Sequence, residues 1–146
     1  MILGRLLALW EAGARIVVAT DAGIGPGKPH DLMAYAVLQL AAATRDPVGA
    51  LRAATSQAAD ALGLADSCGR LAPGRSADLL VVRGQAGTDV GALLDVEAVY
   101  RGGEQLAGPS SRPRPPGWPT PAERSEPSAT HDVQPLATPT RNTSNQ

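Results

Sequence analysis

Asp21 is the clearest candidate for a catalytic residue, because it follows a short apolar run and begins a loop rich in glycine and proline. His30 closes the same loop. A carboxylate placed beside a reacting group can shuttle a proton. Two simpler interpretations remain open: Asp21 as a loop cap on Gly23 or Gly25, and His30 as a surface histidine at a helix start.

The remaining reactive side chains do not complete a metal site. Lys28 is the only lysine and is expected to be an ordinary exposed loop residue, and Cys68 lies in a turn-prone stretch without a histidine nearby and is expected to be inert. The second histidine, His131, falls in the polar C-terminal part of the chain. Because a catalytic zinc takes three protein ligands plus water, Asp21 alone cannot hold one.

The elements expected around Asp21 form one α/β unit. Apolar residues at three- and four-residue spacing predict an amphipathic helix from Ile2 to Trp10, and Gly13 suits the position just past its end. The β-branched run from Arg15 to Thr20 predicts a strand buried on both faces, as in parallel sheets. The loop would then leave the carboxyl end of that strand, where such sheets place their chemistry.

Local signals predict the elements that follow. Residues 32–43 are expected to form an apolar helix, Asp46 should cap a second helix that starts at Pro47, and Ser56 should cap a third that runs to Leu62. The second half is expected to be β-rich. It contains a buried strand at 78–83, a helical turn at 89–94, and a hairpin of 96–100 with 105–107 around two glycines.

Composition narrows the class of protein. The net charge is −1 without long runs of either sign, so neither nucleic acid nor an anionic membrane is an expected partner. A single cysteine favours a reducing compartment, and no apolar run approaches the roughly 20 residues of a membrane span, so a cytoplasmic location is expected. The stretch 108–146 is rich in Pro, Ser and Thr and is predicted to be a disordered tail.

One ordered series of short segments resembles the C-terminal end of the amidohydrolase superfamily, nearest to its imidazolonepropionase-like and peptidase-like members. The series consists of Thr20–Gly23, Asp46–Thr55, Ala58–Ala59, Leu62–Leu64, Gly69–Gly74, Ala77–Val82 and Val99–Gly102. Each segment alone is common, but their order and spacing together are specific, and the resemblance covers about residues 1–107.

The resemblance implies an α/β fold class, namely the C-terminal part of a (β/α)₈ metal-dependent hydrolase barrel joined to part of a small β-sandwich. Residues 1–65 would end the barrel, with 15–20 as its eighth strand, and 66–107 would belong to the sandwich, followed by the tail at 108–146. Asp78 would begin a sandwich strand and accept hydrogen bonds from turn amides.

The resemblance also implies a function. Asp21 matches the aspartate that lies against a divalent metal, usually zinc, takes a proton from metal-bound water and delivers it to the leaving amine. His30 would lie near the substrate mouth. The expected reaction is hydrolysis of a carbon–nitrogen bond in an amide, cyclic amide or dipeptide-like small molecule.

The other ligands of that family, a His-X-His pair, further histidines and often a carboxylated lysine, have no counterpart in this sequence. We therefore expect the chain alone to bind no metal and to be inactive, and expect the complete enzyme to need an N-terminal portion. Two alternatives remain. The chain is a non-catalytic remnant with an interaction tail, or a helper subunit that completes a split barrel with a partner chain.

Overall fold

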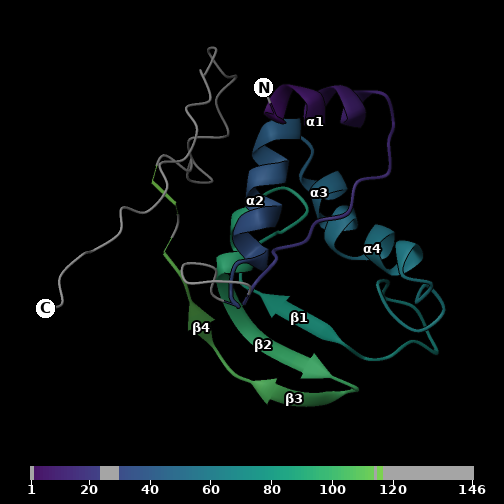
Figure 1. Cartoon of the computed structure of the whole chain (residues 1–146). Helices are drawn as coiled ribbons and strands as arrows, with labels where there is room; N and C mark the ends of the chain where they lie inside the picture. Colours follow the sequence, from purple (N-terminus) through teal and green to yellow (C-terminus); the bar gives the residue numbers. More distant parts are fainter. Residues whose placement is uncertain (1, 24–29, 114, 117–146) are drawn as a thin grey trace, which may run out of the picture. The chain divides into compact units, whose positions relative to one another are not determined.

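A computed structural model describes residues 2–23, 30–113 and 115–116 of the chain (Figure 1). The chain divides after Pro113 into two units, and all helices and strands of the described residues belong to the first unit. That unit places helices α1 to α4 before a small antiparallel sheet, which agrees with the expected α/β class. No helix among the described residues is long and apolar enough to cross a membrane.

The core lies around helix α2 (Met33–Thr44), which packs against α3 (Pro47–Ala54) and contacts α1 (Ile2–Glu11). Val37 and Leu38 of α2 are 2% and 1% exposed, and Ala50 and Ala53 of α3 are fully buried. The expected first two helices and the helix end near Gly13, which has a φ of 76°, are confirmed.

Among the described residues, the segment predicted as a strand at 15–20 has no neighbouring strand to pair with. The segment is extended but belongs to no sheet, and its backbone hydrogen bond among the described residues runs from the Val18 amide to the carbonyl of Ala53 in α3 at 3.1 Å. A strand requires a neighbouring extended segment to share its amides and carbonyls, and here a helix lies beside it instead. The alternating exposure of its side chains also corrects the expectation of burial on both faces.

Of the two predicted helix N-caps, Asp46 and Ser56, only the first is confirmed. The Asp46 side chain accepts a hydrogen bond from the Gly49 amide at 2.7 Å, and Pro47 occupies the first turn, as predicted. For α4 (Ser56–Ala61) the capping prediction was wrong by one residue. Thr55 holds the cap position without a side-chain cap, because its hydroxyl donates back to the Leu51 carbonyl at 2.7 Å.

Removing the Asp46 cap should weaken the packed helix pair. We expect Asp46→Ala to lower the free energy of unfolding by about 1 kcal/mol, because the Gly49 amide loses its acceptor. Asp46→Asn retains a side-chain oxygen and should cost much less. Urea unfolding of both variants followed by circular dichroism measures the difference, and equal losses would show that the hydrogen bond is not the source.

The sheet contains β1 (Leu79–Val82), β2 (Asp95–Arg101), β3 (Glu104–Ala107) and β4 (Ser110–Ser111). All pairs are antiparallel; β1 and β3 flank β2, and β4 also pairs with β2 (Figure 1). The glycines at 102 and 103 both have positive φ, as a two-residue hairpin turn requires, so the predicted hairpin is confirmed. The predicted helical turn is the 3₁₀ helix η1 (Val90–Leu94), capped by Asp89.

Two expectations about this half need correction. Strand β1 is not buried: Leu80 and Val81 are 51% and 42% exposed, because β1 is an edge strand and the described residues leave much of both faces uncovered. Ser110 and Ser111, inside the segment predicted to be disordered, are ordered by pairing with Val96 and Asp95. From residue 117 onward the predicted tail lies outside the described residues.

An ion cluster ties the extended segment to α4. Asp60 accepts two hydrogen bonds of 2.9 Å from Arg70 and one of 3.3 Å from Arg15. The hydrogen bonds from Arg70, together with the positive charges of Arg70 and Arg15, lower the pKa of Asp60 below its ordinary value, although partial burial opposes them. The folded state therefore holds the Asp60 proton more weakly than the unfolded chain does.

This pKa shift predicts an acid-dependent loss of stability. A carboxyl whose folded-state pKa is depressed adds stability above its unfolded pKa of about 3.9, and that stability is lost as pH falls through the folded value. We expect Asp60→Asn to lower the Tm at pH 7 and to have progressively less effect below about pH 4. Thermal unfolding of wild type and variant from pH 7 to pH 3 measures this, and a constant difference would contradict it.

Candidate functional site

Asp21 stands immediately after the extended segment, at an exposed turn. Its φ is 49°, in the left-handed region that residues other than glycine seldom adopt, and Gly23 follows with a φ of 81°. The Ala22 amide donates to the Thr20 hydroxyl at 3.2 Å, which holds the start of the turn. Aspartate adopts this region more readily than most residues, because its short polar side chain can hydrogen-bond locally.

The structure brings His30 back to this turn. A methyl group placed on Gly23 would lie 2.8 Å from His30 Cε1 and 3.2 Å from Nε2, so the imidazole occupies the space that any side chain at position 23 would need. The two predicted site residues therefore belong to one cluster, which we call the Asp21 turn (residues 20–23 with His30). Residues 24–29 between them, including Lys28, lie outside the described residues.

The close contact at Gly23 makes a specific prediction. Gly23→Ala should displace the His30 ring and strain a backbone of positive φ, because the new Cβ would overlap Cε1. We expect loss of the nuclear Overhauser effect between the His30 ring and residue 23, measured by NMR. Gly74→Ala has a similar φ of 80° and meets no atom within 4 Å, so it controls for backbone strain alone.

The other singled-out residues have structural roles where they are described. Asp78 Oδ1 accepts a hydrogen bond from the Gly102 amide at 2.8 Å, which confirms the expected contact with a turn amide. The Cys68 thiol donates weakly to the Leu64 carbonyl at 3.7 Å. His131 lies outside the described residues.

The described residues do not provide a complete set of metal ligands. Within residues 2–23, 30–113 and 115–116, no three His, Cys, Asp or Glu side chains are grouped so that they could hold an ion. A catalytic zinc requires three such ligands. The Asp21 turn can supply a carboxylate and an imidazole, but the described residues do not fit a complete zinc site.

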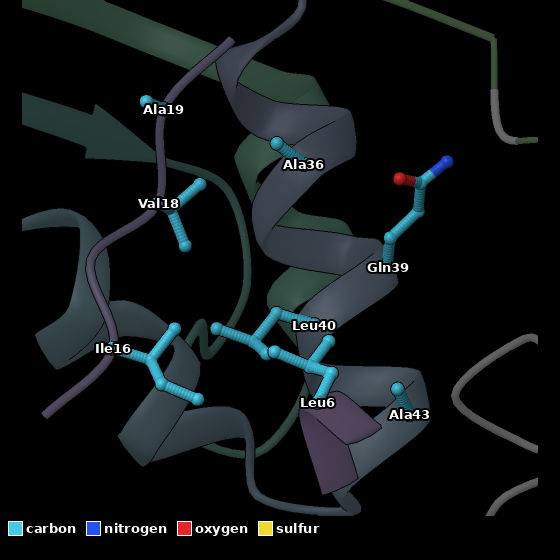
Figure 2. Close-up of a pocket in the computed structure, with 8 residues that line it drawn as sticks. All are labelled: Leu6, Ile16, Val18, Ala19, Ala36, Gln39, Leu40 and Ala43. Atoms are coloured by element: carbon cyan, nitrogen blue, oxygen red, sulfur yellow. The ribbon is translucent and has the colours of Figure 1, made fainter. Parts of the chain in front are cut away.

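An apolar hollow of about 280 Å³ lies beside the extended segment that leads to Asp21 (Figure 2). Its lining comes from α1, the extended segment and α2, and consists of Leu6, Ile16, Val18, Ala19, Ala36, Gln39, Leu40 and Ala43. Gln39 is the one polar lining residue, and its side chain points away from the others in Figure 2. The hollow has no ionisable lining residue, so it is suited to apolar packing and not to chemistry.

The profile of the amidohydrolase family matches residues 4–106, which include the Asp21 turn, α2 to α4 and the first three strands apart from Ala107. The chain belongs to the amidohydrolase family. The predicted resemblance is thereby confirmed. Residues 107–146 lie beyond the match.

Individual relatives agree with this amidohydrolase assignment. An imidazolonepropionase from Ralstonia nicotianae is 40% identical over 81 residues, which cover 56% of this chain and 20% of that protein. A protein from Bifidobacterium longum proposed to be a prolidase has a similar structure, with a TM-score of 0.68, 31% identity, and coverage of 77% of this chain and 28% of its own. The structure of a Xaa-Pro dipeptidase with bound methionine in the active site is also similar, with a TM-score of 0.66 and 26% sequence identity. The match covers 73% of this chain and 26% of the dipeptidase.

This amidohydrolase chain thus spans between a fifth and somewhat over a quarter of the length of these relatives.

One feature of the site could not be found from sequence. Asp31, the neighbour of His30, binds Arg112, and 81 residues separate the two. Arg112 lies in the part of the chain predicted to be disordered, and no local signal pairs it with Asp31.

Proposed function

We propose that this amidohydrolase chain supplies Asp21 as the proton-transferring carboxylate for hydrolysis of a carbon–nitrogen bond in a small amide, cyclic amide or dipeptide. The observation that carries the proposal is the Asp21 turn itself. Asp21 ends the extended segment, has the His30 imidazole packed on the same turn, and falls inside the family match.

The chemistry that Asp21 performs in this proposal is proton transfer. An exposed carboxylate can accept a proton from an attacking water and donate it to the departing amine, and such catalysis contributes about 10²–10⁴ in rate. A divalent metal, zinc by the family resemblance, would lower the pKa of that water. The described residues do not supply its ligand set, so our proposal assigns the remaining ligands to polypeptide outside them.

The arrangement of residues 15–20 supports the proposal that other polypeptide supplies the remaining ligands. In our proposal residues 15–20 are the eighth strand of a (β/α)₈ barrel, residues 1–65 end that barrel, and residues 66–107 belong to a β-sandwich. Among the described residues this segment shares a backbone bond with a helix but with no strand. The apolar hollow beside it gives neighbouring barrel elements a surface to pack against (Figure 2). A preceding portion or a partner chain would supply those elements.

Metal content and hydrolysis test the proposal together. The full chain, purified and supplied with zinc, is compared with a fusion that joins it to the part of the Bifidobacterium longum protein outside the matched 28%. Bound zinc is measured by atomic absorption. Hydrolysis is measured on an imidazolone and on Xaa-Pro dipeptides, which the names of two relatives suggest.

We expect zinc binding and hydrolysis by the fusion and neither by the chain alone. Stoichiometric zinc with hydrolysis by the chain alone would contradict the need for further polypeptide. A folded fusion that binds zinc but cleaves no amide would contradict the catalytic role and favour a non-catalytic remnant.

A further inference from the structure

The segment that follows the hairpin is held against two elements of the fold. Its strand β4 pairs with the start of β2, at Asp95 and Val96. The Arg112 amide then donates to the Leu94 carbonyl at 2.8 Å, which fixes where the Arg112 side chain begins. We call residues 110–113 the C-terminal strap, and they lie beyond the 4–106 family match.

The strap forms hydrogen bonds with Asp31, just before α2, and with Tyr35 in its first turn. Nη1 of Arg112 donates to the Asp31 carbonyl oxygen at 2.9 Å and also bonds the Asp31 carboxylate. One turn further, the Tyr35 hydroxyl donates to the Pro113 carbonyl at 3.1 Å. Arg112 therefore holds both the backbone and the side chain of Asp31, so it restrains the chain at that residue in a way that a carboxylate contact alone would not.

Asp31 is covalently joined to His30, whose ring packs on Gly23 in the Asp21 turn. Any restraint on the Asp31 backbone therefore limits where the His30 ring can lie. The side chains of Arg112 and Asp31 are 36% and 50% exposed, so solvent weakens the ion pair. The hydrogen bond from Arg112 to the Asp31 carbonyl oxygen and the pairing of β4 with β2 therefore fix the position of Asp31 relative to the sheet.

We propose that Arg112 is a positioning residue of the candidate site, which keeps the His30 imidazole on the Asp21 turn by holding Asp31. The proposal rests on the proposed function for the meaning of the site, but the contact it predicts exists whether or not the chain catalyses anything. It assigns a role to a residue outside the 4–106 family match.

NMR on the full-length chain tests the proposal through the nuclear Overhauser effect between the His30 ring and the Gly23 Hα protons. We expect Arg112→Gln to abolish this effect and to shift the His30 ring resonances, and Arg112→Lys to restore it in part, because lysine keeps the charge without the planar fork. Asp31→Asn keeps the carbonyl bond and should reduce the effect less than Arg112→Gln does.

Arg101→Gln is the matched control, since Arg101 is an exposed arginine at the opposite end of β2 from the β4 pairing. Its spectrum around His30 should equal that of wild type. Thermal unfolding of every variant separates local displacement from loss of fold. Should Arg112→Gln lose its fold, Tyr35→Phe, which frees the Pro113 end of the strap, is expected to weaken the same effect.

Retention of the His30–Gly23 effect in folded Arg112→Gln overturns the proposal. That result leaves the proposed function intact, because it concerns only what holds His30. Conversely, loss of the effect in Arg112→Gln, together with an Asp21→Asn fusion that hydrolyses at the wild-type rate, supports the positioning role and removes the proposed function.

Discussion

Asp21→Asn is expected to lower the hydrolysis rate of the fused enzyme by about 10²–10⁴-fold, the usual contribution of a positioned acid–base group. Asparagine has the size of aspartate and, like it, tolerates the left-handed backbone that position 21 requires, so the turn should keep its shape. It cannot accept a proton from water at neutral pH. The loss should therefore appear in kcat, with the folded state unchanged by circular dichroism.

Asp66→Asn provides the matched control for this experiment. Asp66 is a fully exposed aspartate whose contact with Arg75, at 3.9 Å, is long for an ion pair, so its amide variant should keep wild-type kcat. Equal rates for Asp21→Asn and Asp66→Asn would reject a catalytic role for Asp21. Its left-handed φ would then reflect loop geometry alone, which is the simpler interpretation of the sequence.

Leu38→Ala is expected to lower the free energy of unfolding by about 2–5 kcal/mol, the usual range for truncation of a buried leucine. Leu38 is 1% exposed on α2, a helix that contacts α1, α3 and η1. Its truncation leaves a cavity that adds to the lost burial of the side chain. Urea unfolding followed by circular dichroism measures the change.

Leu71→Ala tests whether burial is the cause. Leu71 is 86% exposed, so its truncation removes little buried surface and should change the free energy of unfolding by less than about 0.5 kcal/mol. A Leu38→Ala variant as stable as Leu71→Ala would show that burial of Leu38 does not stabilise the chain.

Local chemistry explains what could be predicted from sequence. The Asp46–Pro47 helix start, the helical turn of η1 and the two-glycine hairpin each depend on residues within a few positions of one another. Their hydrogen bonds are short in sequence, so residue type alone selects them. Asp21 and His30 were likewise identified from residue type, loop composition and an ordered series of motifs, and the family match contains both.

Tertiary structure decided the features that need a distant partner. The β-branched run at 15–20 has the composition of a strand, but strand formation depends on a neighbour, and here the Val18 amide meets the carbonyl of Ala53 in a helix. The exposure of Leu80 and Val81 follows from the edge position of β1, which its apolar composition does not reveal.

The candidate site divides in the same way. Sequence by itself determined that this chain carries a candidate catalytic carboxylate in a glycine-rich loop, because side-chain chemistry and turn preference are local properties. Only the tertiary structure could place the His30 ring on Gly23 and join Arg112 to Asp31. The Arg112–Asp31 contact depends on how the sheet directs a segment 81 positions further along the chain back to the start of α2, and no local pattern encodes that return.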